Sequence, residues 1–138
     1  MLFRSLGVPF ELNHTNPLKA SFPLNQSDMF WTWQLGHKFL RLDTVSDDKN
    51  WSFHLGSTGC KAPSSMRSPE GECSHPNRFE YEINNFDTSK PIYFHLDRLL
   101  ESVKQDNDCM SNPASDVCKT LFQNLHNRNV FSQAKLKH

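Results

Sequence analysis

The sequence predicts a mainly β domain: an incomplete antiparallel β-sandwich with two short C-terminal helices and two disulfides. Three observations support this class: short runs of alternating apolar and polar residues, turn-forming residues between them, and an apolar stripe of helical spacing near the C-terminus. The 138 residues suit a single domain over residues 1–138. Eleven Phe, three Trp and two Tyr supply much of the expected core.

The N-terminal region is expected to be extended and then polar. Residues 7–12 favour extended backbone because Pro9 fixes its own φ angle. Residues 13–28 are mostly polar and contain two further prolines, so they predict a turn region. His14 lies in this turn region, away from any apolar run.

Residues 29–42 are the most aromatic stretch of the chain. Alternating apolar and polar side chains over residues 31–35, with Trp31, Trp33 and Leu35 as the apolar ones, favour a strand. The alternation slips after Gly36, where a bulge would account for the change of phase. A short helical start capped by Ser27 or Asp28 is the competing interpretation.

The remaining elements are expected to be short and separated by turns. We expect a turn at residues 47–50, a loop at 61–77, and strands at 51–55, 79–83 and 92–96. A short helix is expected at 96–103, and a last helix that begins at Pro113 and is capped by Asn112. The apolar stripe of that last helix is Ala114, Val117, Cys118, Leu121, Phe122 and Leu125. The tail from Phe131 to His138 is expected to fray.

The four cysteines fall into two local pairs, and neither pair has the short spacing of a zinc knuckle. Two disulfides, Cys60–Cys73 and Cys109–Cys118, are the natural interpretation, and four reduced structural cysteines are the alternative. Disulfides imply an oxidising compartment, so we expect a periplasmic or secreted protein. The first residues are too quickly polar for a signal peptide, and we therefore expect residues 1–138 to be the C-terminal part of a longer exported domain.

Composition argues against several function classes. Formal net charge is zero, from 15 basic and 15 acidic residues, and no basic patch stands out, so nucleic acid is a poor candidate partner. No apolar run approaches the length of a membrane span. Ser57 does not lie in a nucleophile elbow, and no glycine-rich phosphate loop is present. We therefore expect a binding protein and not an enzyme.

Histidines and tryptophans are the candidate functional side chains. The seven histidines form no closely spaced pair, so a metal site would have to be assembled from distant segments. The alternative is a buried, hydrogen-bonded His54 and six solvated histidines. The three tryptophans favour core packing, or an aromatic platform in a carbohydrate- or protein-binding β-module without metal.

Several strings of the sequence resemble the MbnP-like family, four-cysteine copper-binding "metallo-mystery pair" proteins related to MopE and CorA. The strings are GVPFELNH at 7–14, PLN at 23–25, MFWTWQLGHKFLRLD at 29–43, HLGSTGC at 54–60, CSHPNR at 73–78 and the cysteines at 109 and 118. The resemblance extends from Gly7 to about Phe122. One departure is His37, where the family usually has tyrosine. His37 is a candidate additional ligand or a simple replacement of that tyrosine.

The resemblance implies a periplasmic or secreted β-sandwich that binds one copper ion. Its histidine ligands would be His14 and His54, which lie inside the matching strings. A further ligand would be a tryptophan oxidised to kynurenine by a di-haem, cytochrome c peroxidase-like partner of the MbnH type. The candidates for this modification are Trp31, Trp33 and Trp51. Opening the indole ring frees an aryl amine whose lone pair can bind copper, whereas intact indole only donates a hydrogen bond.

Overall fold

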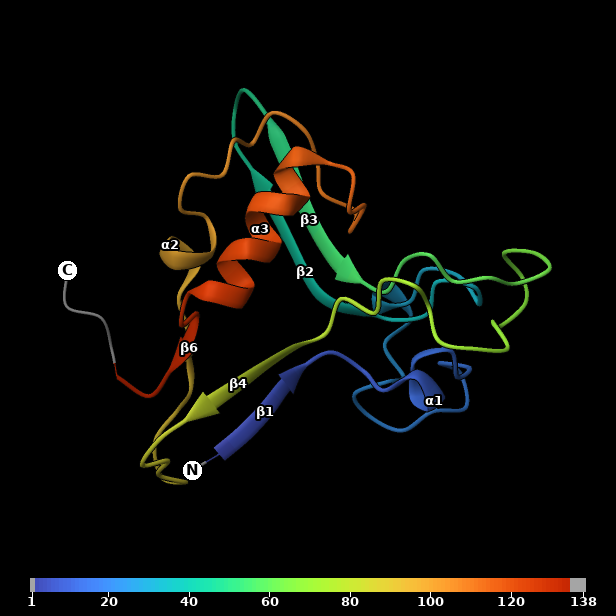
Figure 1. Cartoon of the computed structure of the whole chain (residues 1–138), viewed down its shortest axis with the longest axis horizontal. Coiled ribbons are helices and arrows are strands. Elements are labelled where there is room, and N and C mark those ends of the chain that lie inside the picture. The colour runs from blue at the N-terminus through green and yellow to red at the C-terminus, as the bar shows by residue number, and fades with distance from the viewer. Residues whose placement is uncertain (1, 135–138) are drawn as a thin grey trace.

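The computed structural model describes residues 2–134 and contains three two-stranded antiparallel ladders, β1–β4, β2–β3 and β5–β6 (Figure 1). The fold-class prediction is confirmed: strands dominate, the sheets are open, the helices are short, and two disulfides are present. No helix among the described residues is long and apolar enough to cross a membrane. The elements are β1 (Leu2–Leu6), α1 (Phe10–Asn13), the 3-10 turn η1 (Ser27–Met29), β2 (Lys38–Val45), β3 (Asn50–Gly56), β4 (Phe79–Ile83), β5 (Tyr93–Phe94), α2 (Leu96–Leu99), α3 (Asp116–Asn127) and β6 (Phe131–Ser132).

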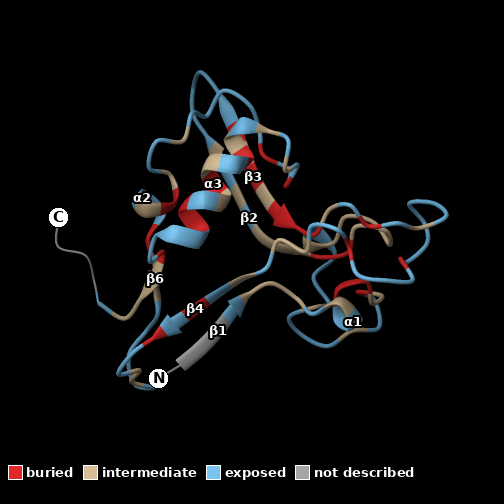
Figure 2. Ribbon diagram, viewed as in Figure 1, coloured by how far each residue is buried: buried red, intermediate tan, exposed pale blue. Residues whose placement is uncertain are grey.

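The β2–β3 hairpin supplies one side of the core. Its turn is closed by the Ser46 amide, which donates to the Lys49 carbonyl at 3.1 Å, so the predicted turn is confirmed. Alternation along β3 buries Trp51, Phe53 and Leu55 on one face. Figure 1 shows α3 lying across this hairpin, and Figure 2 shows buried residues, in red, on both elements.

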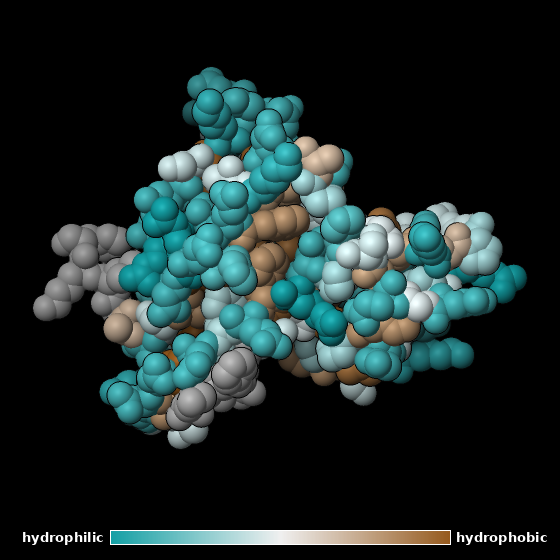
Figure 3. Space-filling view, in the orientation of Figure 1, coloured by the Kyte–Doolittle hydropathy of each residue, from teal (hydrophilic) through white to brown (hydrophobic). Residues whose placement is uncertain are grey.

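Helix α3 supplies the other side of the core through Cys118, Leu121 and Leu125, all of which are fully buried. The helix begins at Asp116 because the Ser115 hydroxyl accepts from the Cys118 amide. The predicted start at Pro113 with an Asn112 cap is therefore wrong. In Figure 3 the core reaches the surface as a brown strip bordered by hydrophilic side chains.

Both predicted disulfides are confirmed. Cys109–Cys118 joins a loop beside β3 to α3, and both cysteines are inaccessible to solvent. Cys60–Cys73 closes the long loop that follows β3, as predicted for residues 61–77. Two disulfides agree with an oxidising, extracytoplasmic compartment.

The N-terminal half differs from the sequence prediction at two segments. Of the segment 7–12 expected to be extended, residues 10–12 instead belong to α1, in which the Pro9 carbonyl accepts from the amides of Leu12 and Asn13. Residues 31–35 form a turn instead of a strand, and the carbonyl of Thr32 accepts from the Gly36 amide at 2.7 Å. The competing helical start near residue 27 appears as η1, and the β-bulge lies between Lys38 and Leu40, just after Gly36.

The remaining differences concern β1 and the C-terminal region. Strand β1 was not predicted and pairs with β4, which the sequence did predict. The expected strand at residues 92–96 is confirmed only over β5, and the expected helix at residues 96–103 only over α2. The expected fraying of the tail is wrong at Phe131 and Ser132, which pair with β5, and residues 135–138 lie outside the described residues.

Candidate metal centre

His14 is a buried side chain at the C-terminal end of α1. Its Nδ1 lies 3.0 Å from the Trp33 carbonyl oxygen, and its ring packs at a tilt against Phe10. A carbonyl oxygen can only accept, so Nδ1 carries the proton and Nε2 carries the lone pair. Burial lowers the pKa of His14, an effect that the Trp33 carbonyl partly opposes and nearby His37 reinforces. The neutral form needed for metal ligation is therefore favoured.

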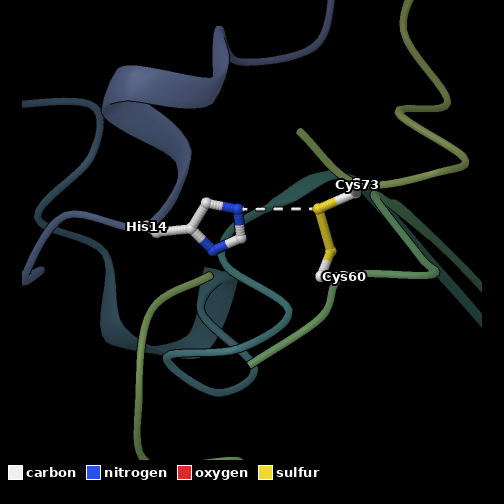
Figure 4. A group of neighbouring side chains, drawn as sticks. All are labelled: His14, Cys60 and Cys73. Atoms are coloured by element: carbon white, nitrogen blue, oxygen red, sulfur yellow. Dashed lines mark hydrogen bonds between the residues drawn. A yellow bond between two sulfur atoms is a disulfide. The ribbon is translucent and has the colours of Figure 1, made fainter. Parts of the chain in front are cut away.

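The lone pair of His14 faces a disulfide. Nε2 lies 3.8 Å from Cys73 Sγ, and the potential ligand atoms of His14, Cys60 and Cys73 all lie within 4.8 Å of one another (Figure 4). All three residues are buried. Sulfur binds metals as thiolate, and both sulfurs are tied up in the S–S bond. In the oxidised protein this group therefore offers one good ligand, the imidazole.

His54 lies on the face of β3 that points away from the core, opposite Arg41 of β2. Its Nε2 donates to Asp43 Oδ1 at 2.8 Å, and Asp43 also accepts from Arg41 Nε. The hydrogen bond from His54, followed by those from Ser52 and Arg41, holds the pKa of Asp43 well below its usual range. Because the carboxylate accepts, the proton of a neutral His54 sits on Nε2 and the lone pair on Nδ1.

Two comparisons with known proteins bear on this arrangement. A family model described as MbnP matches residues 2–119. The chain belongs to the MbnP family. Among solved structures, MbnP from Methylosinus trichosporium matches with a TM-score of 0.66 and 29% sequence identity, over 81% of this chain and 44% of that chain. The present chain thus spans less than half of the length of that MbnP, and no curated protein matches it.

The candidate ligands of this MbnP-family chain do not all lie together. One group of at least three metal-ligating side chains occurs in the described residues, and it contains His14 but neither His54 nor His37. His14 and His54 each have one ring nitrogen held by an acceptor, the arrangement that commonly orients metal-bound histidines. Each imidazole separately fits a copper ligand. That His14 and His54 bind the same ion stays a prediction.

His37 is a buried residue whose two ring nitrogens both face carbonyl oxygens. Nδ1 lies 2.6 Å from the Asn13 oxygen, and Nε2 lies 3.0 Å from the Leu24 oxygen. The ring also makes an edge contact with Phe30. A neutral imidazole can donate to only one of these oxygens, and the other nitrogen could bind a metal only if the carbonyl oxygen that faces it moved away. The arrangement therefore favours a structural role.

The three tryptophans have different surroundings. Trp51 is 2% exposed, and its indole N–H donates to the Asn107 carbonyl at 2.8 Å, as expected of a core residue. Trp33 is partly exposed and makes an edge contact with Phe30. Trp31 is also partly exposed and packs so closely on Gly56 that a Cβ there would lie 2.6 Å from its Cζ3.

Sequence reasoning missed two features of the site. It did not single out Asp43, which orients His54, although the alternation of β2 places Arg41 and Asp43 on one exposed face. It also missed the contact of His14 with the Cys60–Cys73 disulfide, which joins segments far apart in the chain. No local pattern could have revealed that contact, because it depends on the tertiary fold.

Proposed function

We propose that this protein binds one copper ion outside the cytoplasm, through the imidazoles of His14 and His54. The observation that carries the proposal is that each histidine has one ring nitrogen held by an acceptor, Trp33 O or Asp43 Oδ1, which leaves the other nitrogen with its lone pair. Imidazole nitrogen suits copper, and copper binds such sites more tightly than other divalent first-row metals. Membership of the MbnP family supports the same conclusion.

We further propose that a tryptophan oxidised to kynurenine supplies another ligand. In that oxidation the indole ring loses four electrons and four protons, the electrons pass to a di-haem partner that a peroxide has oxidised, and two water molecules supply the oxygen atoms added at C2 and C3. A third water molecule then hydrolyses the formamide and releases C2 as formate. The aryl amine that remains is a nitrogen donor. Partial exposure supports Trp31 or Trp33 as the modified residue, whereas the buried and hydrogen-bonded Trp51 is better suited to the core.

The protein would act as a copper-binding protein and not as an enzyme, in the periplasm or after secretion. The two disulfides support such a compartment. The surroundings of His54 support an accessible site, because its face of the β2–β3 hairpin also carries the exposed side chains of Arg41 and Asp43. A redox partner could approach that face.

Copper titration of the oxidised protein tests this proposal. We expect one ion per chain, severe weakening in His14→Ala and loss of binding in His54→Ala. His126→Ala is the matched control because His126 is exposed on α3. Unchanged binding in both ligand variants would show that these histidines are structural, and no copper binding at all would favour a carbohydrate- or protein-binding module.

A further inference from the structure

The surroundings of the Cys60–Cys73 disulfide resemble a metal site that lacks only thiolates. The imidazole of His14 presents its unprotonated Nε2 to Cys73 Sγ at 3.8 Å, while Nδ1 is fixed on the Trp33 carbonyl. An outer acceptor of this kind sets the tautomer and ring orientation in metal-bound histidines. His14 therefore already has the geometry of a ligand directed at the two sulfurs (Figure 4).

Backbone and side-chain hydrogen bonds hold the two cysteines together independently of the S–S bond. The Ser74 amide donates to the Gly59 carbonyl at 3.0 Å, and Thr58 and His75 exchange two backbone hydrogen bonds. On the other side Gln34 Nε2 donates to the Cys60 carbonyl at 2.9 Å. Because these contacts do not involve sulfur, we expect both thiols to stay beside His14 after reduction.

The two disulfides differ in access to solvent. Cys60 and Cys73 are 6% and 5% exposed, whereas Cys109 and Cys118 are 0% exposed within the core. The residues on either side of Cys60 and Cys73 line an open pocket of about 560 Å³. The Cys60–Cys73 disulfide therefore lies closer to solvent than the Cys109–Cys118 disulfide, and we expect a reductant to attack it first.

We propose that a dithiol reductant converts this group into a Cu(I) site formed by the thiolates of Cys60 and Cys73 and by His14 Nε2. In the reduction the S–S bond breaks, the reductant passes two electrons and two protons to the sulfurs, and its own thiols become a disulfide. Copper then replaces the two thiol protons, which are released to solvent. This site shares His14 Nε2 with the one under Proposed function, so one chain cannot fill both at once; it differs in that it needs the reduced protein and uses sulfur.

Cu(I) is the ion that this ligand set fits best. Thiolates favour soft cations, among which Cu(I) and zinc are the usual occupants. Structural zinc sites are almost always completed by four protein ligands, and the group here has three. A three-coordinate site with two sulfurs and one nitrogen therefore favours Cu(I).

The test compares the oxidised and the reduced full chain under anaerobic conditions. A phosphine reductant is added and then removed. Alkylation of one portion of the sample confirms that Cys60 and Cys73 are free thiols. The remaining, unalkylated portion is titrated with Cu(I) in competition with a chromogenic Cu(I) chelator. We expect the reduced protein to take one Cu(I) from the chelator and to develop a thiolate-to-copper charge-transfer band. The oxidised protein, which contains only the site under Proposed function, should not show that band.

Variants identify the ligands. In the reduced protein His14→Gln should weaken Cu(I) binding by about 10–100-fold. Replacing a residue that only hydrogen-bonds to a metal ligand already lowers metal affinity by this much. His75→Gln is the control, because His75 is close to Cys73 but is exposed and bonds to Ser74. The Cys60→Ser/Cys73→Ser variant should not develop the band. Unfolding on reduction, or equal Cu(I) binding by the wild type and either ligand variant, would overturn the proposal.

Discussion

His54 donates to Asp43 across the β2–β3 hairpin, although the two residues are not directly paired: His54 is opposite Arg41, and Asp43 is opposite Ser52. The diagonal hydrogen bond of 2.8 Å fixes the ring of His54 and leaves its Nδ1 free of the carboxylate. Carboxylate–histidine pairs of this kind raise the basicity of metal-bound imidazole. Asp43 is therefore expected to control the copper affinity of His54 without binding the ion.

Replacing Asp43 with Asn should weaken copper binding by about 10–100-fold, the effect that loss of an outer partner of a metal-bound histidine usually has. The measurement is a copper titration of the oxidised protein. Asp28→Asn is the matched control, since Asp28 also lies near Arg41 but has no hydrogen bond to His54. Equal losses of copper affinity in Asp43→Asn and Asp28→Asn would mean that net charge, and not the orientation of His54, sets the affinity for copper.

Asp43→Asn should also remove a pH-dependent part of the free energy of unfolding. The pKa of folded Asp43 is held below its ordinary value of 3.8, so folding favours the ionised carboxylate. That contribution is complete above a pH of about 3.8 and is lost as the pH falls below it, toward the lower folded-state pKa. Urea midpoints of the wild type and the variant should therefore differ most at neutral pH and converge in acid. A difference that is constant with pH would contradict this assignment.

Gly36→Ala should destabilise the junction that positions His14 and His37. Gly36 has a φ of +80°, and a Cβ there would lie 2.6 Å from the Asn13 carbonyl oxygen. The backbone conformation alone costs about 1–2 kcal/mol for a residue with a side chain, and the steric clash adds to this. Gly71→Ala is the control, because its Cβ would meet nothing within 4 Å. Thermal unfolding measures the stability of both variants. Equal stabilities of Gly36→Ala and Gly71→Ala would contradict the requirement for glycine at position 36.

Mass spectrometry of the protein from its native host should show which tryptophan is modified. Conversion to kynurenine removes one carbon and adds one oxygen, a gain of about 4 Da on a single tryptophan peptide. We expect the gain on the peptide of Trp31 and Trp33, with the Trp51 peptide unchanged. Modification of Trp51 would mean that the core opens during oxidation. No modified peptide would remove the third ligand from the proposal.

Local patterns in the sequence predicted the parts of the fold that depend on neighbouring residues. The turn at residues 47–50, strand β3 and both disulfides involve short chain separations, and each was confirmed. Alternation along residues 51–55 also correctly separated the buried face from the face that carries His54.

The incorrect elements depend on contacts between distant segments. Alternation in residues 31–35 predicted a strand, but the neighbouring backbone turns at Gly36, where Asn13 binds the amide of His37. Strand β1 exists through pairing with β4, far along the chain. The same limitation applies to the candidate site, because the partners of His14 and His54 follow from strand register and loop packing.

The most direct test of the copper proposal is electron paramagnetic resonance of the oxidised protein loaded with one Cu(II) per chain, with and without ¹⁵N-labelled histidine. The proposal predicts hyperfine couplings from two imidazole nitrogens that change with the label. One coupling should disappear in the weakly binding His14→Ala variant, His54→Ala should give no protein-bound copper signal, and His126→Ala should be unchanged. Couplings that are insensitive to the histidine label, or that are the same in all three variants, would contradict ligation by His14 and His54.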